Sequence, residues 1–151
     1  LSAYGRLYEV DARLRPTGKS GSLATSREEF GRYFAEGDGQ LWERQALCKA
    51  RVVAGSAATT KAAMAAAGRA AFEHRWRRRD AGEIRRMRHR LEETASGGDV
   101  KRGPGGIVDI EFLVQMLQLK HGRRDPKVRS PSTLSALAAL AESGHLARNH
   151  C

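Results

Sequence analysis

The spacing of apolar and polar side chains changes from a period of two to a helical period after about residue 25. Residues 4–14 (YGRLYEVDARL) alternate between two faces, with Leu7, Glu9, Asp11 and Arg13 on one and Tyr8, Val10, Ala12 and Leu14 on the other. This alternation is typical of a half-buried strand. Proline and glycine follow, so residues 16–22 are expected to form a turn, and residues 22–25 are a candidate for a short returning strand.

The helical part begins with a capping pair. Ser26 is followed three residues later by Glu29, so that each side chain can accept a hydrogen bond from the other residue's backbone N–H. A helix over residues 27–35 is therefore predicted. A second helix over residues 40–53 is predicted because it places Leu41, Gln45, Cys48 and Val52 on one face.

The middle of the chain combines an alanine-rich segment with an arginine-rich one. Residues 57–71 have a high helix propensity but little apolar bulk for packing. Ile84, Met87 and Leu91 recur at helical spacing and predict a further helix with one buried stripe. Eight arginines lie between positions 75 and 90, most of them opposite that stripe, and such a run is typical of a solvated helix face.

The last third contains a glycine-rich segment between helical patterns. Residues 96–106 (SGGDVKRGPGG) are expected to be the most flexible part of the chain. A helix over residues 107–121 carries two apolar bands, which predicts that it is enclosed between neighbours. The bands consist of Ile107, Ile110, Val114 and Leu117, and of Val108, Phe112, Met116 and Leu119. A polar row between the bands consists of Glu111, Gln115 and Gln118. A final helix is predicted over residues 132–142.

Composition narrows the class of partner. The chain has 27 Lys and Arg against 17 Asp and Glu, a net charge of +10, which favours phosphate-bearing partners. Aromatic residues are few and are not interleaved with basic ones, so nucleic acid is an unlikely partner. Cys48 and Cys151 form neither a disulfide framework nor a metal cluster, which favours a reducing cytoplasm. No apolar run reaches the roughly 18 residues of a membrane span, so no membrane association is expected.

The tripeptide Gly18-Lys19-Ser20 has the ending of a phosphate-binding loop. That loop requires G-x-x-x-x-G-K-S, and the first glycine position is here occupied by Arg13. A true phosphate loop is therefore rejected. Lys19 stays a candidate for a phosphate contact, with an exposed turn lysine as the alternative.

Asp11 is the more informative residue of this region. It shares a strand face with Arg13, and two interpretations are open. One is a salt bridge on the strand, which contributes about 0–1 kcal/mol when exposed. The other is a ligand for Mg²⁺, which prefers carboxylate oxygen, although one carboxylate is too few for a site.

Three long blocks carry a resemblance to a known family. They are LYEVDARLRPTGKSGSLATS, LWERQALCKARVV and KRGPGGIVDIEFLVQ, together spanning residues 7–115. In order and spacing they resemble the bacterial glutamine synthetase adenylyltransferases, bifunctional enzymes that add AMP to glutamine synthetase and remove it. The first block looks more like the C-terminal, adenylylating copy than the N-terminal, deadenylylating one.

The resemblance implies an α+β fragment that is mostly α. Family members carry two nucleotidyltransferase domains of the DNA polymerase beta type, each followed by an all-helical domain. Residues 1–56 would be the trailing part of one such nucleotidyltransferase domain, and residues 57–151 the beginning of the helical domain. The alanine-rich residues 57–71 match no known feature of the family.

The resemblance also implies roles for individual residues. Asp11 matches the third metal carboxylate of the family, which holds Mg²⁺ during attack on ATP. The other two come from a G-S-x-x-D-x-D segment that would precede Leu1, so the fragment is expected to be inactive alone. Arg13 and Arg15 are placed to meet phosphate or to orient Asp11, with a sheet salt bridge as the alternative.

Asp109 and Glu111 belong to the third block, which contains the Gly-Gly-Ile-x-Asp-Ile-Glu-Phe wording of the family. They are candidates for contact with nucleotide or metal. Helix capping by Asp109 and a buried hydrogen bond of Glu111 are the alternatives.

The implied reaction is AMP transfer from ATP to a tyrosine hydroxyl of glutamine synthetase, regulated through a PII signal protein and glutamine. Three alternatives stay open: the deadenylylating copy, which uses phosphate; a PII uridylyltransferase; and a basic helical module that binds nucleic acid without catalysis.

Overall fold

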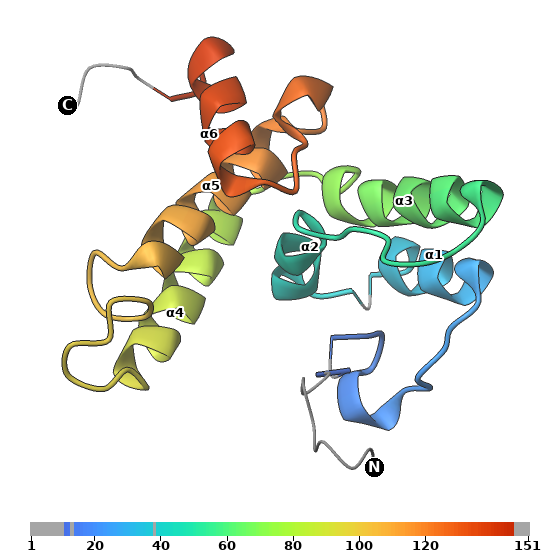
Figure 1. Cartoon of the computed structure of the whole chain (residues 1–151), viewed down its shortest axis with the longest axis horizontal. Helices are drawn as coiled ribbons and strands as arrows, with labels where there is room; N and C mark the ends of the chain where they lie inside the picture. Colours follow the sequence, from blue (N-terminus) through green and yellow to red (C-terminus); the bar gives the residue numbers. More distant parts are fainter. Residues whose placement is uncertain (1–10, 13, 38, 147–151) are drawn as a thin grey trace, which may run out of the picture.

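A computed structural model of the chain describes residues 11–12, 14–37 and 39–146, and within them the fold is helical (Figure 1). The helices are α1 (Arg27–Ala35), α2 (Leu41–Leu47), α3 (Ala57–Phe72), α4 (Arg78–Glu93), α5 (Ile107–His121) and α6 (Thr133–Glu142), with 3-10 turns η1 (Gly18–Ser20) and η2 (Pro126–Val128). The mostly-α prediction is confirmed. The α+β nucleotidyltransferase part is not seen, because the described residues contain no strand.

Two strand predictions can be compared with the structure only in part. Most of the predicted strand over residues 4–14 lies outside the described residues, and its described positions 11, 12 and 14 are not in a strand. The predicted returning strand over residues 22–25 is wrong, since this segment is irregular. A strand needs a hydrogen-bonded neighbour, and no described segment provides one.

Most helix predictions are confirmed, and one is wrong in length. The capping box of Ser26 and Glu29 begins α1 as predicted. The helix predicted over residues 40–53 ends at Leu47. After Leu47 the backbone tightens, since the N–H of Lys49 donates to the carbonyl of Ala46 at 3.1 Å, three residues back.

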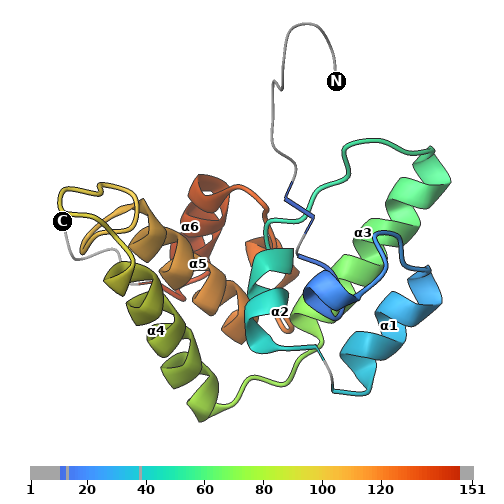
Figure 2. The same cartoon turned by 90° about the horizontal axis from the view of Figure 1, so that it is seen from below.

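Helix α5 contacts α2, α3, α4 and α6, and Figure 2 shows it flanked by α4, α6 and α2. Two buried clusters meet on it. The first contains Leu41, Cys48, Ala71, Phe72, Ile84 and Leu119. The second contains Val114, Leu117, Val128, Ala136 and Leu140. The prediction of a helix enclosed between neighbours is therefore confirmed for the C-terminal part of α5.

The N-terminal part of α5 departs from the prediction. Ile107 and Ile110 belong to a predicted apolar band but are 58% and 48% exposed. The same band is buried further along at Val114 and Leu117, in the cluster that α6 completes. The band is thus covered only where α6 reaches it.

Arg44 was not recognised as structural from the sequence. Its guanidinium is buried and donates to the carbonyl of Ala70, in the last turn of α3, and to that of Phe34, in the last turn of α1. It also lies over the Phe34 ring, 5.1 Å from the centroid. A cation at a helix C-terminus contributes about 0.3–1 kcal/mol, and Arg44 serves two termini at once.

The close packing of Gly122, the residue that follows α5, against Phe72 gives the first prediction. A Cβ on Gly122 would lie 2.8 Å from Cδ1 of Phe72 and 2.5 Å from the carbonyl oxygen of Gln118. We expect Gly122→Ala to lower the free energy of unfolding by about 1–3 kcal/mol, because the buried Phe72 ring must move. Urea denaturation followed by circular dichroism measures this.

The matched control is Gly68→Ala, within α3. A Cβ there meets nothing within 4 Å, so the change should raise the free energy of unfolding by roughly 0.5–1 kcal/mol. Equal effects of the two substitutions would contradict the packing described for Gly122.

Candidate functional site

The predicted site residues fall into two groups that lie in different parts of the fold. Asp11, Arg15 and Lys19 precede α1, whereas Asp109 and Glu111 lie on α5. In both views the loop between α4 and α5 lies at the far end of α4, away from the segment around η1 (Figures 1 and 2). Within this chain the two groups therefore do not converge on one site.

Arg15 organises the turn that precedes α1. Its guanidinium donates to the carbonyls of Ala12, Gly21 and Lys19, at 3.1 Å for Gly21 and 3.4 Å for Lys19. Thr17 adopts the left-handed region with φ 60°, and the chain then enters the 3-10 turn η1. The predicted turn is confirmed, and Gly18-Lys19-Ser20 forms this short turn.

Asp11 and Lys19 are exposed, and Arg13 lies outside the described residues. The part of the chain that the structure describes contains no group of three or more His, Cys, Asp or Glu side chains able to hold a metal ion. A carboxylate alone does not make a magnesium site. The magnesium site predicted around Asp11 is therefore not tested by the described residues and stays a prediction.

Asp109 is held by an arginine from the preceding helix. One carboxylate oxygen accepts from Nε of Arg88 at 2.5 Å, and the other accepts from the N–H of Gly105 at 2.7 Å. Arg88 also donates to the carbonyl of Gly103 at 3.0 Å. The hydrogen bond from Arg88 is the main reason that the pKa of Asp109 lies below its usual range.

Arg88 is an exception to the expectation for the arginine-rich segment. It is 8% exposed, whereas Arg85, Arg86 and Arg90 on the same helix are solvated. A buried arginine of this kind needs a carboxylate and carbonyls to satisfy its N–H groups. The sequence signal that could have identified it is its position four residues after the buried Ile84.

The glycine-rich loop is extensively hydrogen-bonded. The Asp99 carboxylate accepts from the N–H groups of Lys101 and Arg102, both at 2.9 Å. The first amides of α5 donate back into the loop, from Ile107 to Val100 at 3.3 Å and from Val108 to Lys101 at 3.1 Å. Amides that usually make a helix N-terminus an anion site thus already have acceptors here.

Each residue of the polar row on α5 has a polar partner on another segment. Glu111 forms an ion pair with Lys49, and Gln115 accepts from the side-chain amide of Gln45 at 2.9 Å. Gln118 donates to the carbonyls of Val128 and Ser130 at 2.7 and 2.8 Å. The nucleotide contact predicted for Glu111 is untested by these contacts and stays a prediction, as does the one for Asp109.

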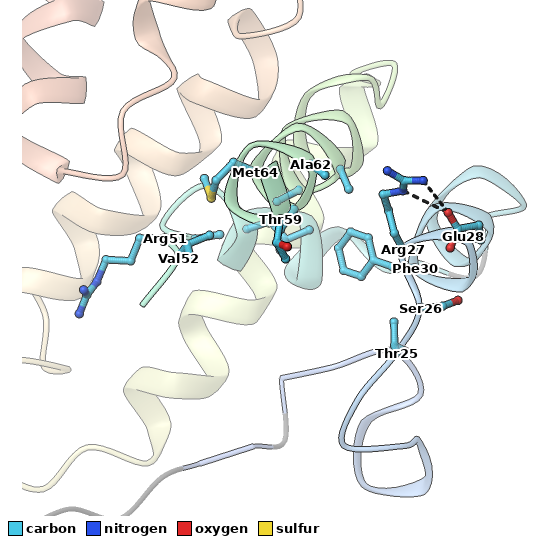
Figure 3. A pocket seen from close by; sticks show the side chains of 15 residues that line it. Thr25, Ser26, Arg27, Glu28, Phe30, Arg51, Val52, Thr59, Ala62 and Met64 are labelled. Carbon is cyan, nitrogen blue, oxygen red and sulfur yellow. Dashed lines mark hydrogen bonds and ion pairs between the residues drawn. The ribbon is translucent and has the colours of Figure 1, made fainter. Parts of the chain in front are cut away.

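Among the open grooves of the described residues, two border α2 or the segment that follows it and are relevant to the predicted site residues. The larger, about 610 Å³, runs between α3, the start of α1 and the segment after α2, with Phe30 and Met64 on its walls (Figure 3). Its charged lining includes Arg27 and Glu28, which pair with each other at 2.8 Å. The second, about 510 Å³, lies between α2, α4 and α5. Neither groove is lined by Asp11, Arg15 or Asp109.

The contact between Arg88 and Asp109 predicts a pH dependence. Because the pKa of Asp109 is lower in the folded chain, its carboxylate stabilises the fold above the unfolded pKa of about 4. This contribution is lost as the pH falls through the folded value. We expect wild-type stability to fall more steeply below about pH 4 than that of Asp109→Asn, measured by urea unfolding at a series of pH values.

Glu36→Gln is the control, because Glu36 is an exposed carboxylate at the end of α1. Its pH profile should match that of the wild type. A profile of Asp109→Asn that is as steep as the wild-type profile would show that the carboxylate of Asp109 does not carry this dependence.

Comparison with known proteins covers nearly the whole chain. The family model described as glutamate-ammonia ligase adenylyltransferase matches residues 1–66, and the one described as GlnD PII-uridylyltransferase matches residues 70–151. The two ranges meet inside α3. The predicted boundary between residues 56 and 57 stays a prediction.

Three similar curated proteins bear the name bifunctional glutamine synthetase adenylyltransferase/adenylyl-removing enzyme. The one from Streptomyces avermitilis is 37% identical over 148 residues, which are 95% of this chain and 15% of the relative. The one from Mycobacterium marinum is 38% identical over 150 residues, 97% and 15% of the two chains. The one from Leifsonia xyli is 40% identical over 149 residues, 94% and 14% of the two.

The chain therefore spans about 15% of the length of the first of these relatives. Its match to them runs through all three blocks on which the resemblance was based. We conclude that the chain belongs to the family of bacterial bifunctional glutamine synthetase adenylyltransferase/adenylyl-removing enzymes.

Proposed function

We propose that this chain is part of an enzyme that transfers AMP from ATP to a tyrosine hydroxyl of glutamine synthetase. The observation that carries the proposal is the continuous similarity to adenylyltransferases across the block that contains Asp11. The wording LYEVDARLRP supports the adenylylating half over the deadenylylating half. The activity belongs to the whole protein, since the chain spans about 15% of its relatives.

Asp11 is proposed to supply one of the carboxylates that hold Mg²⁺. The other two would come from a G-S-x-x-D-x-D segment, which this chain does not contain. When bound, the ion would neutralise charge on the phosphates of ATP. Arg15 would then act mainly by holding the turn after Asp11, because its guanidinium donates to the carbonyls of that turn.

The positive side chains near Asp11 support a polyphosphate substrate. Arg13 and Lys19 are the proposed phosphate contacts, and Lys19 is exposed on the turn. Pyrophosphate would leave as the tyrosine oxygen attacks the α-phosphorus of ATP, so that one P–O bond forms as another breaks. Charged side chains around the phosphates would stabilise the negative charge that develops there.

Partners and location are proposed on the same basis. Glutamine synthetase is the proposed substrate and a PII signal protein the proposed regulator, in a reducing cytoplasm.

Burial raises the pKa of the Cys48 thiol to about 12, so this cysteine stays protonated and serves as a core residue. None of the described helices is long and apolar enough to cross a membrane.

The deadenylylating reaction is the second candidate, because the relatives are named for both activities. In that case phosphate would release ADP from adenylylated glutamine synthetase. Release of ADP by the full-length protein, with no AMP incorporation, would favour this candidate. A non-catalytic nucleic-acid module would instead show salt-sensitive binding of DNA or RNA that survives Asp11→Asn.

The proposal predicts that Asp11→Asn abolishes AMP transfer by the full-length protein. Losing one metal carboxylate should lower the rate of labelled AMP incorporation by about a hundredfold or more and leave the thermal unfolding midpoint unchanged. Glu36→Gln is the matched control with wild-type activity, and the 151-residue chain is the negative control. Wild-type incorporation by Asp11→Asn would refute the role of Asp11.

A further inference from the structure

Two polar contacts join α2 and the turn that follows it to α5 at matching intervals. Gln45 pairs with Gln115, and Lys49 pairs with Glu111. The two residues on each segment are four positions apart. The two segments run antiparallel, since position 45 pairs with 115 and position 49 with 111. We refer to these two pairs as the ladder.

The two pairs of the ladder differ in burial. Gln45 and Gln115 are 3% and 8% exposed, so this amide pair lies inside the interface. The side chains of Lys49 and Glu111 are 41% and 27% exposed, so this ion pair lies at its edge. Gln45, Lys49 and Gln115 also line the groove of about 510 Å³ between α2, α4 and α5.

The ladder crosses the line between the two matched family models. Helix α2 lies in the part that matches adenylyltransferases, and α5 lies in the part that matches PII-uridylyltransferases. The guanidinium of Arg44 makes another such link, through the carbonyl of Ala70. The ladder thus lies where residues 70–151, the part that matches PII-uridylyltransferases, pack on residues 1–66, the part that matches adenylyltransferases. We refer to these as the helical part and the transfer part.

The composition of the ladder favours a positioning role over a stabilising one. A buried amide pair usually costs stability unless each of its polar atoms is bonded, and Oε1 of Gln45 has no partner among the described residues. The apolar contacts around it, among them Leu41 and Leu119, could hold the helices together without polar groups. Polar pairs add specificity, because only one register of α2 against α5 satisfies both pairs at once.

Building on the proposed function, we propose that the ladder fixes the helical part in one position on the transfer part, and that Lys49 and Glu111 are positioning residues for AMP transfer. The structure places Glu111 against Lys49, so we propose that Glu111 acts through this pair, and the reversal experiment below separates this role from a direct contact with the nucleotide. An error of about 1 Å in the placement of reacting groups can cost a hundredfold in rate. A register error between the two parts would have this effect.

Charge reversal in the full-length protein tests the proposal. Lys49→Glu and Glu111→Lys should each lower kcat for AMP transfer by about tenfold, with the KM for ATP changed by less than about threefold. The double reversal should return kcat to within about threefold of the wild type, because the ion pair is restored with its charges exchanged. Lys49→Arg should retain activity.

The matched control reverses the exposed pair of Arg27 and Glu28, which should leave kcat and KM unchanged. Urea unfolding of the 151-residue chain gives a second cycle, in which each single reversal lowers the midpoint and the double reversal restores it. Single reversals without effect on kcat would overturn the proposal. A raised KM for ATP that the double reversal does not repair would also overturn it and favour a direct contact of Glu111 with ATP.

Failure of the proposed function has a different outcome. A wild-type full-length protein that incorporates no AMP under any condition would refute that function and the positioning role with it. The unfolding cycle would then still decide whether the ladder exists, since an unrestored midpoint in the double reversal would refute it.

Discussion

The burial of α5 on several sides is the constraint on which the rest of this structure depends. Its apolar residues join one cluster with α2, α3 and α4 and another with α6 and the turn before it. A helix enclosed in this way cannot place polar side chains freely, so each one needs a specific partner. Glu111, Gln115 and Gln118 find theirs in Lys49, Gln45 and the carbonyls around η2. The packing of α5 therefore also determines which segments of the chain must meet.

The same constraint gives the third family block a structural explanation. The glycines in KRGPGG allow the loop to turn back, so that its carbonyls accept the first amides of α5. Gly105 has φ 72°, a left-handed conformation that favours glycine. The carboxylate of Asp109 then accepts hydrogen bonds from Arg88 of α4 and from the N–H of Gly105 in the loop. The block that contains the candidate residues Asp109 and Glu111 thus also connects α4 to α5 within this chain.

The sequence was sufficient for elements whose signals are local. The capping box of Ser26 predicted α1, and the spacing of apolar residues predicted α5 with its bounds. It failed where the decisive partner is distant: Arg44 and Arg88 look like solvated arginines until the carbonyls and carboxylates of other helices surround them. The length of α2 was overestimated because the tightened turn at Leu47 competes with a continuing helical pattern. The sequence also could not place Asp11 and Asp109 relative to each other, because they belong to elements whose arrangement only the fold determines, and their roles stay predictions.

Amide hydrogen exchange resolved by residue tests the central role of α5 most directly. Buried helices exchange only through global opening, whereas exposed loops exchange locally. The account predicts that Val114, Leu117 and Leu119 exchange among the slowest amides of the chain, and that Gly105 and Val108 are also protected by their bonds to Asp109 and Lys101. Exchange of the α5 amides as fast as those of the exposed α1, with the loop amides at the rate of an unstructured peptide, would contradict it.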